Sequence, residues 1–138
     1  MEQKITHLLK HGNLRSTTAR KLVLQEFLLA GNQAMSSAEI EKKLEDMDRI
    51  TLYRTLKTFE EAGLIHQAVD VSGKSKYAIC SEDCSTDHHK DHHAHFYCKK
   101  CKKTVCLEEV HIPAIQVPST YQLEDQQLIL SGICDTCQ

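Results

Sequence analysis

Residues 48–64 read DRITLYRTLKTFEEAGL, and this stretch places the strongest constraint on the fold. Asp48 favours the N-cap of a helix, and Gly63 is a typical helix end. An apolar stripe at helical spacing lies between them; its members are Leu52, Leu56 and Phe59. Once that stripe faces a core, the side chains that face outward are those of Tyr53, Arg54 and Lys57.

The residues before this stretch predict three more helices. The first ends near Gly12, the second runs from Thr17 to Gly31, and the third starts at Ser36, whose capping box is completed by Glu39. The residues after it, 64–71 and 76–80, form two extended runs around a polar Ser-Gly-Lys-Ser tip, which predicts a hairpin. Helices followed by a hairpin indicate a winged helix-turn-helix; the alternative is a generic small helical domain.

Cysteine and histidine dominate the composition and define two halves. The chain of 138 residues has seven Cys and nine His, and every Cys lies at or after Cys80. The odd Cys count and the lack of an N-terminal apolar stretch argue against a secreted disulfide scaffold. No run is apolar enough to span a membrane. We therefore expect a cytoplasmic protein with no membrane partner, in which clustered thiols bind metal.

The boundary between the halves is predicted near residues 80–85. We assign residues 1–82 to the winged-helix domain and residues 83–138 to a small, mainly stranded α/β domain, so the fold class is α+β. Strands are expected at 95–97, 103–107 and 127–133. Pro113 and Pro118 leave little room for a helix between them. The net charge of −2 argues against a non-specific nucleic-acid coat protein but does not exclude a DNA reader with one basic face.

Two Cys-x-x-Cys pairs, Cys98–Cys101 and Cys134–Cys137, predict a metal site. Each pair can present two thiolates to one ion, and two pairs complete the closed tetrahedral set that structural Zn²⁺ prefers. One pair alone would be compatible with a redox motif. Four thiolates leave no open position for a substrate, so the site is interpreted as structural zinc that helps a small domain to fold.

A histidine-rich segment precedes the first pair. His93 and His95 point to the same face of a strand, so their imidazoles can share one metal ion. His66, Cys80, Cys106 and Glu108 are further candidate ligands at the junction of the halves. For His88 and His89 the alternative is a surface loop that binds metals weakly, and no role is assigned to Cys84, His92 or His111.

These motifs together resemble the ferric uptake regulator family. The resemblance rests on Arg15-x-Thr17-x-x-Arg20, on Thr51-Leu-Tyr-Arg-Thr-Leu56 with Phe59, and on the His-rich segment before Cys98-x-x-Cys101 with the terminal pair. It covers nearly the whole chain. It implies a homodimeric, metal-dependent repressor that binds a palindromic operator in double-stranded DNA. The residues implied or expected to contact DNA are Arg15, Thr17, Arg20, Arg49, Thr51, Tyr53, Arg54 and Lys57; a solvated face is the alternative for Arg54 and Lys57.

The resemblance also implies a sensory metal set, with ligands His66, Cys80, His93 and His95. Cys106 is an additional or replacement ligand, and Glu108 a further candidate. Thiolate ligands favour zinc over ferrous iron, and Ala78 stands where iron-type members have an acidic ligand. We therefore expect zinc-sensing control of metal uptake genes. The alternatives are an iron- or peroxide-responsive regulator and, more remotely, a metal-storage protein or chaperone. No metalloprotease or deaminase signature is present, so an enzyme is not expected.

Overall fold

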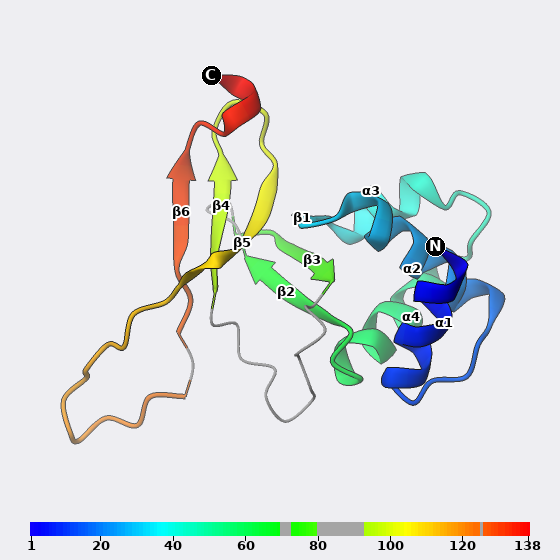
Figure 1. Cartoon of the computed structure of the whole chain (residues 1–138), viewed down its shortest axis with the longest axis horizontal. Coiled ribbons are helices and arrows are strands. Elements are labelled where there is room, and N and C mark those ends of the chain that lie inside the picture. Colours follow the sequence, from blue (N-terminus) through cyan, green and yellow to red (C-terminus); the bar gives the residue numbers. More distant parts are fainter. Residues whose placement is uncertain (70–72, 80–92, 125) are drawn as a thin grey trace.

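A computed structural model describes residues 1–69, 73–79, 93–124 and 126–138 (Figure 1). The described part of the first half contains four helices, one short strand and a hairpin. Their bounds are α1 Glu2–His11, α2 Thr18–Ala30, β1 Gln33–Ala34, α3 Ser37–Lys43, α4 Arg49–Glu61, β2 Ile65–Val69 and β3 Ser75–Ile79. Among its described residues, the second half contains three strands and a 3₁₀ turn: β4 His93–Cys98, β5 Thr104–His111, β6 Ile129–Gly132 and η1 Asp135–Cys137. No helix among the described residues has the length and apolar character needed to cross a membrane.

Side-chain caps start three of the helices. Thr17 accepts a hydrogen bond from the Arg20 amide at 3.2 Å, Ser36 from Glu39 at 3.2 Å, and Asp48 from Thr51 at 3.4 Å. Each cap satisfies an amide that has no partner inside its own helix. The predicted starts at Thr17, Ser36 and Asp48 are therefore confirmed.

The four helices enclose a core of their own. The apolar stripe of α4 lies in it, because Leu52, Leu56 and Phe59 are at most 2% exposed. Side chains of the other helices pack around this stripe; the fully buried ones include Leu9, Val23, Leu24, Phe27 and Ile40. The winged-helix half is therefore held by ordinary apolar burial.

The hairpin is the predicted wing. Strands β2 and β3 are antiparallel, with His66 opposite Ala78. On the helix side, Tyr77 exchanges backbone hydrogen bonds with Met35 at 2.7 and 2.8 Å, and Tyr77 and Ile79 pack against the helical core. The winged helix-turn-helix prediction is confirmed.

The second half is a sheet whose strand order is β1-β5-β4-β6. Strands β4 and β5 are antiparallel, and β4 and β6 are parallel. The strand at one edge, β1, comes from the first half, and it pairs Gln33 with Val105 and Ala34 with Thr104. The α+β class and the stranded second half are thus confirmed. The predicted boundary at 80–85 lies outside the described residues.

Small apolar side chains line part of the junction between the halves. Ala34, Ala68 and Ala78 form a buried cluster with Cys106. These side chains let the wing approach the second sheet closely, yet they bury little apolar surface. By the usual scaling of burial with area, this junction gains far less from the hydrophobic effect than the helical core.

The chain between β5 and β6 extends away from both halves in Figure 1 and contains no helix at residues 112–124. It carries exposed apolar side chains, among them Ile115, Val117, Tyr121 and Leu123. Such a set of exposed apolar residues is characteristic of a contact surface.

Candidate functional site

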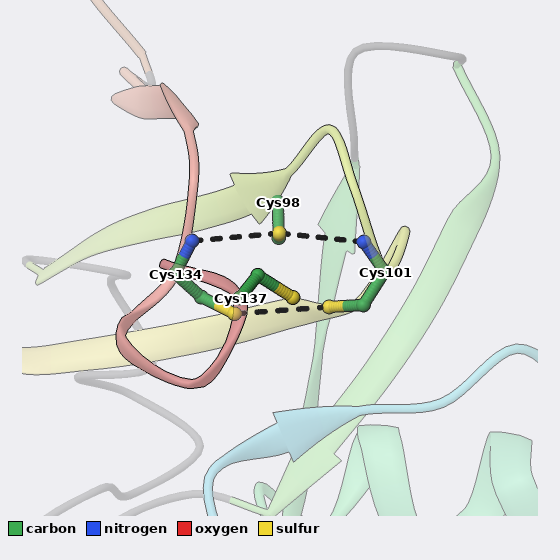
Figure 2. Close-up of side chains that lie close together, drawn as sticks. All are labelled: Cys98, Cys101, Cys134 and Cys137. Carbon is green, nitrogen blue, oxygen red and sulfur yellow. Dashed lines mark hydrogen bonds between the residues drawn. The ribbon is translucent and has the colours of Figure 1, made fainter.

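The two Cys-x-x-Cys pairs meet at one end of the second sheet. Cys98 ends β4 and Cys137 ends η1. Because β4 and β6 run parallel, with Cys98 beside Gly132, the two turns that follow these strands lie together. The four ligand atoms of Cys98, Cys101, Cys134 and Cys137 all lie within 4.8 Å of one another (Figure 2).

Backbone amides hold the Cys98 thiol as an acceptor. Its Sγ receives N–H groups from Cys101 and Cys134, each at 3.4 Å (Figure 2). These bonds, that of Cys101 first, lower the pKa of Cys98 to about 6, since hydrogen bonds to a charged form favour it. A further hydrogen bond joins the two turns: the Lys100 ammonium donates to the Cys137 carbonyl at 3.2 Å.

The pKa values of Cys134 and Cys137 also depend on their neighbours in the cluster. The Thr136 hydroxyl, 3.3 Å from the Cys134 Sγ, is the first cause of a lowered pKa for Cys134. The neighbouring Cys134 thiol raises the pKa of Cys137 to about 12. Closely placed thiols therefore oppose full ionisation of the set, and a divalent cation is the group that would compensate four thiolates. The chemistry of the donor set fits zinc.

A second cluster lies at the junction of the halves. His66 comes from the wing strand β2, His95 from β4 and Cys106 from β5, and all three are buried. Their ligand atoms lie within 4.8 Å of one another. The Cys106 Sγ is 3.4 Å from the His66 Nε2, and the two imidazole rings are 5.7 Å apart between centroids. Two imidazoles and a thiol in this arrangement can hold a transition-metal ion.

The structure brings together part of the expected sensory set. His66 and His95 meet, and the third member is Cys106. Glu108 is exposed and lies outside the cluster. His93 and His111 have strand backbone and pair with each other, but their side chains are not described. Cys80, Cys84, His88, His89 and His92 lie outside the described residues.

Sequence reasoning missed Asn32. This residue follows the end of α2, and its carbonyl accepts the Cys106 amide at 2.9 Å while its side-chain amide donates to the Cys106 carbonyl at 3.3 Å. The winged-helix half therefore holds both the backbone amide and the backbone carbonyl of Cys106 through Asn32. No periodicity or motif marks Asn32, because its partner is 74 residues away.

The exposed face of α4 carries three candidate DNA contacts. Tyr53, Arg54 and Lys57 are exposed, and Tyr53 leaves 47% of its surface accessible. Arg49, at the start of the helix, pairs with Glu41 at 2.8 Å. An outward aromatic and basic face on the second helix of a helix-turn-helix is suited to the major groove.

The remaining candidate DNA contacts also have local structural partners. Thr17 caps α2 and the Thr51 amide is held by the Asp48 cap. The Arg20 guanidinium donates to the Arg15 carbonyl at 2.8 Å. Arg15, Thr17 and Arg20 thus form one local unit at the start of α2, where Arg15 itself is exposed.

Comparisons with known proteins agree on one family. The sequence profile of the ferric uptake regulator family matches residues 11–131. The ferric uptake regulation protein of Legionella pneumophila is 30% identical, over 94% of this chain and 96% of that protein.

Solved structures share the fold. The Vibrio cholerae ferric uptake regulator has a TM-score of 0.60 at 24% identity, covering 91% of this chain and 96% of its own. A zinc uptake regulator complexed with zinc and DNA has a TM-score of 0.63 at 18% identity, covering 98% of this chain and 91% of that chain. A profile match over most of the chain, a winged helix-turn-helix and a four-cysteine cluster together give one conclusion: this chain belongs to the ferric uptake regulator family of metal-responsive transcriptional regulators, and it is not an enzyme.

Proposed function

We propose that this chain is a zinc-sensing repressor that binds a palindromic operator as a homodimer and controls metal uptake genes. The observation that carries the proposal is the buried cluster of His66, His95 and Cys106, whose members come from both halves of the chain. A metal ion held there would tie the DNA-binding wing to the second sheet.

The proposed mechanism is a change in orientation. His66 belongs to the wing, whereas His95 and Cys106 belong to the second sheet. Binding one ion requires both parts to stay docked, so the metal selects one placement of α4 relative to the dimer partner. A coupling free energy of about 1–3 kcal/mol corresponds to a roughly 5–150-fold change in operator affinity, and DNA must tighten metal binding by the same factor. We propose Cys80 and His93 as further ligands of this ion.

Ligand chemistry favours zinc. A Cys among two His provides a softer donor set than the carboxylate-rich sites that suit iron or manganese, and the non-ligating Ala78 is buried opposite His66 in the wing. Iron remains the second candidate, because curated relatives at 25–30% identity are named ferric uptake regulation proteins.

The DNA contacts are assigned to α4 and to the start of α2. We propose that Tyr53, Arg54 and Lys57 enter the major groove, and that Arg15, Thr17, Arg20, Arg49 and Thr51 contact the backbone around it. The similarity in fold to a zinc uptake regulator complexed with DNA supports this placement. Replacing Arg54 by Ala should cost about 1–3 kcal/mol of operator affinity if it reads a guanine.

Exposed apolar residues support the homodimer. Val110, Leu130 and Ile133 in the second half are at least 38% exposed, as are the apolar side chains of the extended segment. Strand β6 lies at an edge of the sheet. An edge strand beside apolar surface favours pairing between copies. Structural zinc in the four-cysteine site would hold that edge in place.

The deciding experiment is a titration of operator binding. The titration uses protein whose four-cysteine site holds zinc and whose junction cluster (His66, His95 and Cys106) holds no metal. The operator duplex is selected beforehand from a random DNA pool with the zinc-loaded protein, and the two are then mixed. Free zinc and free ferrous iron are then buffered separately. Tightening at very low free zinc, with iron inactive, is expected. Tightening by iron alone would assign the chain to iron, and no effect of either metal would contradict metal sensing at the junction.

A further inference from the structure

Lys76 is a charged side chain buried where the two halves meet. It belongs to the wing strand β3 and is 6% exposed. Among the residues whose side chains the structure describes, no other Lys, Arg, Asp or Glu is buried. Burial of an ammonium is unfavourable unless hydrogen bonds compensate for its lost hydration, so the position of Lys76 requires partners.

Its described partners lie on the other half of the chain. The Lys76 Nζ donates to the Lys102 carbonyl at 3.3 Å and to the Thr104 hydroxyl at 3.2 Å. Thr104 is fully buried and pairs with Ala34 of β1. The ammonium therefore lies where β1, the wing and β5 converge.

Lys102 belongs to the turn of the first Cys-x-x-Cys pair. Its amide donates to the Cys98 carbonyl at 2.9 Å, and its φ of 65° is in the left-handed region. A residue other than Gly rarely adopts this conformation. The direction of the Lys102 carbonyl thus depends on the turn that presents Cys98 and Cys101.

We propose that Lys76 is a positioning residue that couples the four-cysteine site to the DNA-binding wing. When the turn is intact, its carbonyl and Thr104 accept the ammonium and the wing stays docked. When the halves separate, these two hydrogen bonds are lost, and the Lys102 carbonyl and the Thr104 hydroxyl must be satisfied by water instead. The four-cysteine site therefore does more than support its own domain, because the docked wing also stabilises the turn that retains its ion.

The experiment compares three variants with the parent protein, with zinc in the four-cysteine site and, for the two measurements without DNA, no metal at His66, His95 and Cys106. Lys76→Met removes the ammonium and keeps an apolar side chain of similar length. Thr104→Val removes one acceptor and keeps the shape. Lys103→Met is the control, since Lys103 is exposed and lies beside Lys102 in the same segment.

Two measurements need no DNA. Hydrogen exchange of the Cys106 amide reports separation of the halves, because its acceptor is the Asn32 carbonyl. Transfer of zinc to a chromophoric chelator reports retention by the four-cysteine site. Lys76→Met should accelerate both the exchange of the Cys106 amide and the transfer of zinc by about tenfold or more, as expected for loss of hydrogen bonds to a charged group. Thr104→Val should accelerate both by a smaller factor, and Lys103→Met should change neither.

A third measurement rests on the proposed function. Operator DNA should slow zinc transfer from the four-cysteine site of the parent protein and have no such effect in Lys76→Met. Unchanged amide exchange and zinc transfer in both Lys76→Met and Thr104→Val would overturn the coupling. If Lys76→Met does not fold, the results for Thr104→Val alone decide whether the four-cysteine site and the wing are coupled. If the DNA-free results hold but operator DNA is never bound, the proposed function fails and the coupling stands.

Discussion

The four-cysteine site and the junction cluster differ in what they join. The first is built from two turns of the second half, partly accessible to solvent, with amides directed at its Cys98 thiol. The second is fully buried and takes His66 from the wing and its other members from the second sheet. A site within one half acts on the other half only through contacts at its edge, such as the hydrogen bonds of Lys76. A site across two halves can report its occupancy as a change in their orientation.

The largest effect is expected from Cys134→Ser, which removes a ligand from the four-cysteine site. Structural zinc sites contribute apparent binding free energies of about 10–16 kcal/mol in small peptides. The second half should lose zinc and most of its stability, while the helices of the first half keep their own core. Zinc analysis and amide exchange in β4 and β5 measure this. A folded variant that retains its zinc would remove the distinction between the sites.

Cys106→Ser should leave the fold intact and abolish the metal response. A serine hydroxyl is a poor replacement for a thiolate, so the junction loses affinity for zinc while the four-cysteine site stays filled. Operator affinity should no longer change by the roughly 5–150-fold expected of the coupling. Fluorescence anisotropy with labelled operator, with and without zinc, tests this, and Cys101→Ser is the contrasting variant. A full response in Cys106→Ser would assign sensing to other ligands.

Asn32→Ala should weaken the response without removing a ligand. The variant loses the side-chain hydrogen bond to the Cys106 carbonyl, worth about 0.5–1.5 kcal/mol, and keeps the backbone one. Zinc bound at the junction would then restrain the DNA-binding half less firmly. The ratio of operator affinities with and without zinc should fall several-fold. An equal change in both affinities would mean that Asn32 acts on the fold and not on the coupling.

The smallest effect concerns pH and the four-cysteine site alone. The lowered pKa of Cys98, about 6, means that folded zinc-free protein holds a thiolate there above that pH. Relative to an unfolded thiol near 9, this favours folding fully above pH 9, and the benefit is lost as the pH falls through about 6. Ultraviolet thiolate absorbance should rise near pH 6. Cys98→Ser should lack that step, and its persistence would assign the thiolate to another cysteine.

Local patterns predicted the helical half well. The caps at Thr17, Ser36 and Asp48 and the stripe of α4 are set by neighbours within a few residues. The paired Cys-x-x-Cys motifs likewise carry their own geometry, and the cluster they predict is present.

The junction was harder to predict, because it depends on strand register between distant segments. The two-residue strand β1 pairs with β5 some seventy residues later, and nothing in its sequence indicates this. The sequence offered Cys106 as one of several candidate metal ligands. Its contact with His66 follows from the pairing of β5 with β4 and from the docking of the wing. Asn32 and Lys76 gain their contacts from the same docking.

The alanine-lined junction has a consequence for how such a regulator can be tuned. Because Ala34, Ala68 and Ala78 bury so little surface, the balance between docked and separated halves lies within reach of single substitutions. Enlarging one alanine would favour separation and raise the free-metal concentration at half response. The set point of the switch can therefore drift between descendants while every ligand and every DNA-reading side chain stays the same.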